Sequence, residues 1–225
     1  QVRGAVSGPD GLTGTSLAGK AIIDLSTVDP DSTRARADEC SHAGAIGYLD
    51  APVLGRPDRA GKWTLPVGGT TETLAYARPV LELLATRILH VGDTGMGNVV
   101  KLLNNLMFGA INTATAEIMA AATQLGLSRQ VLFEAIAESG AATVSNLFLS
   151  VAPRMINGDF SPIFRVELLH KDMRLGIETV KRAGGSLPGA EANQLLNDMA
   201  LGDGLVGNDS SVVVRSIESR LGQAH

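Results

Sequence analysis

The stretch GMGNVVKLLNNLMFGA, from Gly95 to Ala110, decides the fold, because it begins a long apolar helix where the strand pattern stops. Apolar residues surround most of this helix, and a helix that is apolar on nearly all sides is typically buried on all sides. A chain of 225 residues has little material with which to bury it. We therefore expect a homodimer, or a higher homo-oligomer, that packs through the helical region.

Three polar side chains share one side of this helix. Each helical residue turns by about 100°, which places Lys101, Asn105 and Asn112 in one narrow stripe. Lys101 can extend to solvent beside asparagines that satisfy neighbouring backbone groups. Alternatively, it is a proton donor in a substrate site in which Asn105 orients the substrate. Gly97, one turn before Lys101, would let another chain segment or a ligand approach closely.

Upstream of this helix, short apolar runs alternate with helical patterns, which is typical of an α/β layer with a mainly parallel sheet. The expected strands are residues 20–26, 45–53, 63–69 and 87–92, with helices at 30–43 and 71–85. The first residues have the composition of a surface loop, and Thr71 is available as an N-cap. The helices expected downstream are 97–125, 128–138, 144–155, 166–183, 189–201 and 209–221. The sequence thus predicts an α/β region followed by an all-α domain.

Composition excludes several classes of function. The net charge of −4 gives no basic surface for nucleic acid, and no apolar run reaches the 18 to 20 or so residues that span a bilayer. The single cysteine, Cys40, excludes a disulfide framework and a cysteine zinc site within one chain. Cys40 has no helix start beside it to lower its pKa, so we expect an inert thiol. The histidines lack ligand spacing, so we expect no metal, and we expect a cytoplasmic protein.

The segment GMGNVVKLLNN resembles the catalytic helix of the β-hydroxyacid dehydrogenases, the family that contains 3-hydroxyisobutyrate dehydrogenase and tartronate semialdehyde reductase. Other segments match in the same order. DLSTVDP (24–30) is similar to the family's D-x-S-T-x-x-P segment, and YLDAPVLG (48–55) to its D-A-P-V-S-G loop. LPVGG (65–69) resembles the strand after that loop, and FRVELLHKD (164–172) resembles the F-x-x-x-x-x-x-K-D element. The resemblance covers essentially the whole chain.

The resemblance implies an NAD(P)-dependent oxidoreductase that transfers a hydride reversibly between a small hydroxy acid and NADP or NAD. Lys101 would be the general acid/base, because a proton must move on the substrate oxygen when hydride moves on carbon. Asn105 would position the substrate. Ser26 and Thr27 would sit beside the nicotinamide and the substrate carboxylate, at the crevice where the strand order reverses.

The helical domain would also contact the cofactor. By resemblance, Phe164 and Lys171 would close over it and Asp172 would fix that element. Each of these roles has an alternative. Thr27 could cap the helix that begins near Pro30, Phe164 could be a core residue, and Lys171 with Asp172 could be a solvated pair.

The substrate loop departs from the family pattern. Leu54, Gly55 and Arg56, followed by Pro57, stand where the family usually has Ser-Gly-Gly, and these three residues are candidates for substrate binding. Leu54 cannot supply the hydroxyl of the serine, but Gly55 can still offer its N–H. Arg56 either pairs with a carboxylate or is exposed. An imine reductase of the same superfamily is therefore the alternative function, and a non-catalytic dimerisation module is the alternative from another class.

The second departure is the glycine-rich fingerprint. No G-x-G-x-x-G after a strand precedes the matched segments, and GDTGMGN (92–98) is a weak candidate for a phosphate cradle. By resemblance we expect residues 1–92 to be the C-terminal remnant of a Rossmann-type NAD(P)-binding domain that lacks about 70 residues. Residues 93–225 would be the helical substrate and dimerisation domain. We expect this chain alone to bind dinucleotide weakly and to be weakly active or inactive.

Overall fold

The computed structural model describes residues 1–140 and 143–222. The chain divides into two compact units, residues 1–104 and residues 105–225. Each unit has its own hydrophobic core, and each is described by itself below. Within the described residues no helix is both long enough and apolar enough to cross a membrane.

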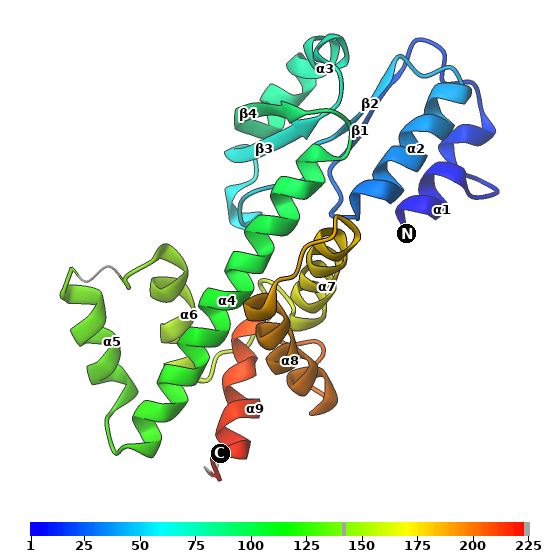
Figure 1. Cartoon of the computed structure of the whole chain (residues 1–225). Helices are drawn as coiled ribbons and strands as arrows, with labels where there is room; N and C mark the ends of the chain where they lie inside the picture. The colour runs from blue at the N-terminus through cyan, green and yellow to red at the C-terminus, as the bar shows by residue number, and fades with distance from the viewer. Residues whose placement is uncertain (141–142, 223–225) are drawn as a thin grey trace. The chain divides into compact units, whose positions relative to one another are not determined.

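The first unit is built on a four-stranded sheet with the order β1-β2-β3-β4 (Figure 1). The strands are β1 (Ala21–Asp24), β2 (Gly47–Asp50), β3 (Trp63–Gly68) and β4 (Ala85–Gly92). β1 and β2 are parallel, as are β3 and β4, whereas β2 and β3 meet antiparallel at the single pair Asp50↔Gly68. The predicted α/β class is confirmed, and the sheet is mixed because β3 follows β2 without a crossover helix.

The helices of the first unit are α1 (Val2–Ser7), α2 (Pro30–His42) and α3 (Thr71–Leu84). Helices α2 and α3 begin at residues whose side chains cap them, whereas α1 has no such cap. Asp29 caps α2 by accepting the N–H of Ser32 at 3.0 Å. The prediction that Thr71 caps the next helix is wrong, because Thr70 Oγ1 accepts the N–H of Thr73 at 3.2 Å. Thr70, one residue earlier than predicted, is the N-cap, and its side-chain oxygen reaches the N–H of the third helical residue, Thr73.

The start of the chain is also not the surface loop that its composition suggested. Residues 2–7 form α1, and the short 3₁₀ turn Leu12–Gly14 follows it. Val6 is buried in a cluster with Leu17, Cys40 and Tyr48. This apolar contact holds α1 in place, since a helix of six residues is not stable by itself.

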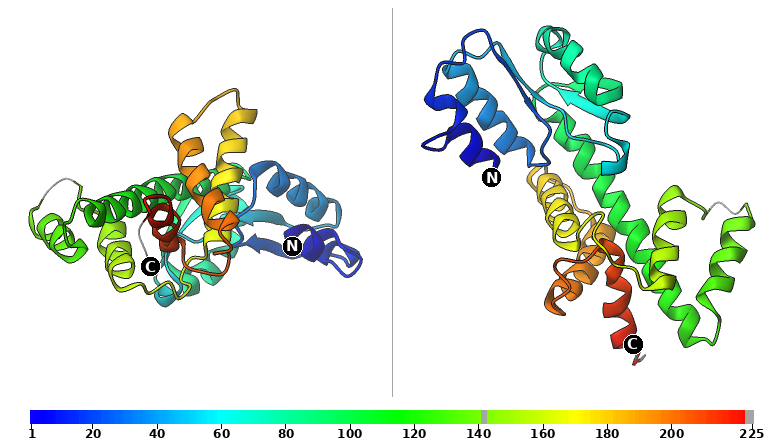
Figure 2. Two further views of the ribbon diagram at one scale, coloured as in Figure 1. Left: turned by 90° about the horizontal axis from the view of Figure 1, so that it is seen from below. Right: turned by 180° about the vertical axis from the view of Figure 1, so that it is seen from behind.

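Helices are the regular elements of the second unit within its described residues, joined by loops and one isolated bridge between Arg165 and Asp209. Its elements are the continuation of α4 (Met96–Gln124), then α5 (Arg129–Glu138), α6 (Asn146–Asn157), α7 (Val166–Arg182), α8 (Pro188–Gly202) and α9 (Val213–Arg220). The 3₁₀ turn η3 (Ser210–Val212) precedes α9. Helices α7 and α8 lie side by side in both views of Figure 2. The predicted all-α region is confirmed.

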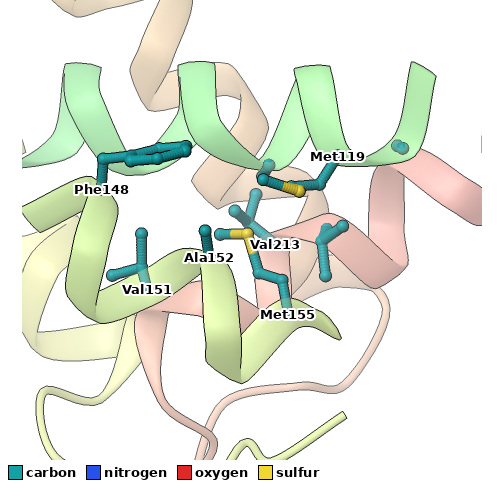
Figure 3. Packing of buried hydrophobic residues seen from close by; sticks show 9 residues of the cluster. Met119, Phe148, Val151, Ala152, Met155 and Val213 are labelled. Carbon is teal, nitrogen blue, oxygen red and sulfur yellow. The ribbon is translucent and has the colours of Figure 1, made fainter. Parts of the chain in front are cut away.

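The core of the second unit joins three helices. Met119 of α4, Met155 of α6 and Val213 of α9 are fully buried and point toward one another (Figure 3). A separate cluster joins α4 to α7 through Leu106 and Met173. The packing fixes the part of α4 that lies in the second unit, which carries Asn105 and Asn112.

Helix α4 is not buried on all sides within the single chain. In the second unit Met107 is 61% exposed and Ile118 is 42% exposed. Both side chains are large and apolar, and they lie eleven residues apart along the same helix, close to three full turns. One stripe of α4 therefore remains open to solvent.

Candidate active site

The loop after β1 is held by a carboxylate. Asp24, the last residue of β1, accepts the backbone N–H of Ser26 at 2.9 Å and the hydroxyl of Tyr48 at 2.7 Å. Burial, and then the bond to Asp24, raises the pKa of the Tyr48 phenol far above its ordinary value. Ser26 is exposed and Thr27 is half-buried. Because the side chain of Asp29 caps α2, the alternative role of Thr27 as that cap is excluded.

Asp50, the last residue of β2, binds the first turn of α4. It is fully buried, and its carboxylate accepts the N–H of Gly95 at 2.7 Å and that of Asn98 at 2.8 Å. The start of a helix leaves such N–H groups without intrahelical partners. Burial raises the pKa of the Asp50 carboxyl, and the two N–H groups oppose that shift. The end of β2 is thus fixed to the start of α4.

Gly97 is where two backbone segments meet α4. A Cβ at this position would lie 2.3 Å from the carbonyl oxygen of Asp50 and 2.6 Å from that of Pro66. Backbone oxygens cannot turn away as the end of a side chain can. The sequence predicted that either another chain segment or a ligand approaches Gly97 closely. The structure shows chain segments there, the backbone at Asp50 and at Pro66.

Lys101 lies one turn further along α4 and is half-buried. Its Nζ donates to the carbonyl oxygen of Val53 at 2.8 Å. Val53 belongs to the loop that follows β2, so the ammonium group is held at the carboxyl end of that strand. This contact disfavours the interpretation of Lys101 as a side chain that simply extends to solvent.

The loop after Val53 is shaped by pairing with β3. Leu54 and Thr64 exchange backbone hydrogen bonds of 2.9 and 3.1 Å, so the N–H of Leu54 is already used. Gly55 has φ +152°, and a Cβ there would lie 2.6 Å from Trp63 Cδ1, so only glycine fits. Arg56 is exposed and has no ion pair among the described residues, which agrees with the exposed alternative for this side chain.

In the second unit, Asn105 is bound to Asp172. Both residues are 3% exposed, and Asn105 Nδ2 donates to Asp172 Oδ2 at 2.6 Å. A carboxylate can only accept, so the NH₂ group of Asn105 must be the end that faces it. Lys171 Nζ lies 3.0 Å from Asp172 Oδ1. Lys171 is partly exposed, but burial of Asp172 excludes a fully solvated pair.

Two other residues singled out in the sequence make contacts within the second unit. Phe164 packs edge-to-face on Phe108, with ring centroids 5.3 Å apart, beside the cluster that contains Leu106. Asn112 is fully buried and its Nδ2 donates to the carbonyl oxygen of Ser210 at 2.9 Å. Helical spacing placed Asn112 in the stripe of Lys101, but its amide binds the η3 turn.

Asp50 and Asn98, which organise this site, were not among the residues predicted from the sequence. A signal was present, because Asp24 and Asp50 lie near the ends of the expected strands 20–26 and 45–53. Polar residues at the carboxyl ends of parallel strands are the usual place for functional groups in open α/β sheets. The position of Asn98 within an apolar helix start was equally visible.

The carboxyl ends of β1 and β2 fit a nicotinamide nucleotide. In open α/β sheets such ligands bind outside the carboxyl ends of parallel strands. There the chain presents the exposed Ser26, the half-buried Thr27 and the Lys101 ammonium group. Hydroxyl groups suit the amide and ribose of such a nucleotide, and a lysine suits proton transfer at the oxygen of a substrate. The residues present are therefore compatible with this cofactor.

Comparison with known proteins gives a consistent result. Residues 95–217 match the family model described as NAD-binding of NADP-dependent 3-hydroxyisobutyrate dehydrogenase. Residues 1–92 match the NAD binding domain of 6-phosphogluconate dehydrogenase. The chain is 32% identical over 223 residues to 2-(hydroxymethyl)glutarate dehydrogenase of Eubacterium barkeri, covering 98% of this chain and 73% of that protein.

A second curated relative and a solved structure agree. The chain is 35% identical over 204 residues to 3-hydroxyisobutyrate dehydrogenase of Pseudomonas aeruginosa, covering 87% of this chain and 68% of that protein. The crystal structure of 3-hydroxyisobutyrate dehydrogenase from Salmonella typhimurium matches with a TM-score of 0.87 and 28% identity. That match covers 96% of this chain and 75% of the other. With the family model matched from the start of α4 to α9, the chain belongs to the 3-hydroxyisobutyrate dehydrogenase family of NAD(P)-dependent oxidoreductases.

Proposed function

We propose that the protein oxidises and reduces a small hydroxy acid with NADP or NAD, and that Lys101 is its general acid/base. The observation that carries the proposal is the bond from Lys101 Nζ to the carbonyl oxygen of Val53. It holds the one lysine of the α4 start at the carboxyl end of β2, where a dinucleotide-binding fold places its substrate.

The chemistry divides between cofactor and protein. The bound nicotinamide supplies hydride exchange at carbon. During oxidation, the amine of Lys101 accepts the proton of the substrate hydroxyl, and during reduction the ammonium returns it to the carbonyl oxygen. The Val53 carbonyl can keep accepting from the ammonium after it has taken the proton, so the group stays in place in both states.

Two relatives support a proposed substrate class. The compounds named for them, 3-hydroxyisobutyrate and 2-(hydroxymethyl)glutarate, both carry a hydroxymethyl group on the carbon beside a carboxylate. We propose the same class for this protein. Gly55 would bind the carboxylate through its N–H and Arg56 through its guanidinium group. Leu54 would contribute an apolar contact, since its N–H is engaged by Thr64.

The other site residues take the following proposed roles. Ser26 and Thr27 contact the nicotinamide and the substrate, which is supported by their place at the end of β1. Asn105 positions the substrate, supported by the fixed orientation of its amide on Asp172. Lys171 contacts the cofactor; it is partly exposed beside that carboxylate.

Three further proposed assignments concern Phe164, the two domains and the oligomeric state. Phe164 contacts the cofactor, which is supported by its partial exposure beside the cluster that contains Leu106. Residues 1–92 form the cofactor domain and residues 93–225 the substrate and dimerisation domain, supported by family matches over 1–92 and 95–217. The protein forms a homodimer through the exposed stripe of α4 that contains Met107 and Ile118. Met107→Lys would then give a monomer in multi-angle light scattering.

The test of Lys101 is chemical rescue in the full-length protein. Lys101→Ala should lower kcat by at least about a hundredfold, the usual contribution of general acid/base catalysis. Added primary amines should restore part of the rate, in proportion to their basicity. Lys20→Ala, at an exposed lysine of the first unit, is the control and should keep full activity. Unchanged turnover of Lys101→Ala would refute the role, and faster turnover of cyclic imines than of hydroxy acids would favour an imine reductase.

A further inference from the structure

Asn98 is a fully buried amide in the first turn of α4, and both polar atoms of its side chain are engaged. Its Oδ1 accepts the backbone N–H of Val28 at 3.1 Å, and its Nδ2 donates to Thr33 Oγ1 at 3.2 Å. Its backbone N–H donates to Asp50 Oδ2 at 2.8 Å. Asparagine is a poor helix former, so local propensity does not explain this residue.

The bonds of Asn98 join two segments that lie seventy residues apart in sequence. Val28 directly follows Ser26 and Thr27 in the loop after β1. Lys101 is three residues beyond Asn98, one turn along the same helix. The side chain of Asn98 thus ties the β1 loop to the turn of α4 that carries the lysine.

We propose that Asn98 is a positioning residue for the reaction, which sets the β1 loop with Ser26 and Thr27 in register with Lys101. The proposal rests on the proposed function of these residues. Asn98 itself need not touch substrate or cofactor. It acts through the N–H of Val28, whose only acceptor among the described contacts is Asn98 Oδ1.

The contacts around Asn98 distinguish a role in positioning the β1 loop from a role in holding helix α4 in place. Asp50 holds the start of α4 through the backbone N–H groups of Gly95 and residue 98, and any side chain at 98 retains these bonds. Lys101 is held separately by Val53. Replacing the Asn98 side chain should therefore leave α4 and the lysine in place and release only the β1 loop.

Three variants of the full-length protein test this role. Asn98→Leu fills the space but removes the acceptor for Val28. Asn98→Asp keeps that acceptor, although it brings a second buried carboxyl near Asp50 and should destabilise the protein more than leucine does. Thr33→Val removes the bond on the other side of the amide, together with the bond from the Thr33 hydroxyl to the carbonyl oxygen of Asp29, and is the control that leaves the bond to Val28 intact.

The expected ranking of activity differs from the ranking of stability. Asn98→Leu should lower kcat/KM by about tenfold to a hundredfold, as small misplacements of reacting groups do. Asn98→Asp should be less stable than Asn98→Leu yet more active, and Thr33→Val should stay within about threefold of wild type, since it leaves the oriented bond to Val28 intact. If activity instead follows stability, or if Asn98→Leu keeps wild-type kcat/KM, the proposal is wrong.

Amide hydrogen exchange gives a readout that does not require turnover. In Asn98→Leu the Val28 amide should lose protection, while the Gly95 amide, which is bound by Asp50, should keep it. Equal loss at both amides would indicate collapse of the helix start and would overturn the proposal. Lys101→Ala is assayed in parallel. An inactive Lys101→Ala beside a fully active Asn98→Leu rejects only the positioning role, whereas an active Lys101→Ala rejects the proposed function.

Discussion

Exchanging the two partners of the Asn105–Asp172 bond is a quantitative test of how this site is built. The bond is 2.6 Å long and both residues are 3% exposed. Asn105→Asp places a second carboxyl against Asp172, and two charges this close repel by at least about 4 kcal/mol at an effective dielectric constant near 20. One carboxyl will take a proton instead. At pH 7 that costs about 4 kcal/mol for a group with an ordinary pKa near 3.9.

Asp172→Asn should lower stability less than Asn105→Asp does, because two amides can still pair. One carbonyl oxygen accepts from the other NH₂ group, so the expected loss is about 1 to 2 kcal/mol. The double variant Asn105→Asp/Asp172→Asn restores a carboxylate–amide bond in the opposite direction. Its free energy of unfolding should lie within about 1 kcal/mol of wild type, far from the sum of the single changes.

The assay is urea unfolding followed by far-UV circular dichroism at pH 7 and at pH 5. The cost of Asn105→Asp should shrink by about 1.4 kcal/mol per pH unit as the solution supplies the proton. Activity should not return in the double variant, because position 105 then offers a carboxylate instead of an amide. Additive losses, or a cost of Asn105→Asp that is the same at both pH values, would refute the assigned contact.

The remaining predictions concern packing, a buried ion pair and the thiol. Gly97→Ala should lower the free energy of unfolding by about 1 to 3 kcal/mol, because the new Cβ meets backbone oxygens. Gly109→Ala should cost less, because its Cβ meets only the flexible end of a methionine side chain. Urea unfolding of both variants gives their ranking. Glu218→Gln should lower the free energy of unfolding by about 2 to 3 kcal/mol, because it removes the ion pair of the half-buried Arg129. Glu178→Gln, in an exposed pair with Arg174, should change it by less than about 0.5 kcal/mol in the same assay. Burial raises the pKa of the Cys40 thiol, so a thiol reagent at neutral pH should label it only after unfolding; rapid labelling of the folded protein would contradict its full burial.

The order of strands and helices was predictable because its signals are local. Apolar runs, glycines and capping residues mark element boundaries within a few residues, and Lys101 followed by Asn105 stands out in an apolar helix. The cap of α3 was misplaced by one residue, because both Thr70 and Thr71 have the right side chain and only backbone geometry distinguishes them. The helix at residues 2–7 depends on burial of Val6, which is a contact distant in sequence.

The polar junctions of the site were not predictable from spacing alone. Asn105 and Asn112 share one helical stripe, yet one binds a carboxylate and the other a backbone carbonyl of the η3 turn. The same holds for Asp50, whose two bonds depend on the approach of β2 to α4. Tertiary contacts over dozens of residues decide these roles, and no local pattern encodes them.

The central claim is hydride transfer that depends on Lys101, and isotope tracing measures it most directly. The full-length protein is incubated with NADP or NAD and with 3-hydroxyisobutyrate deuterated at the carbon that bears the hydroxyl. Mass spectrometry of the reduced nucleotide should find deuterium in the nicotinamide ring for wild type and for Lys20→Ala, but almost none for Lys101→Ala. Substrate oxidation without deuterium in the nucleotide, or wild-type transfer by Lys101→Ala, would contradict the account.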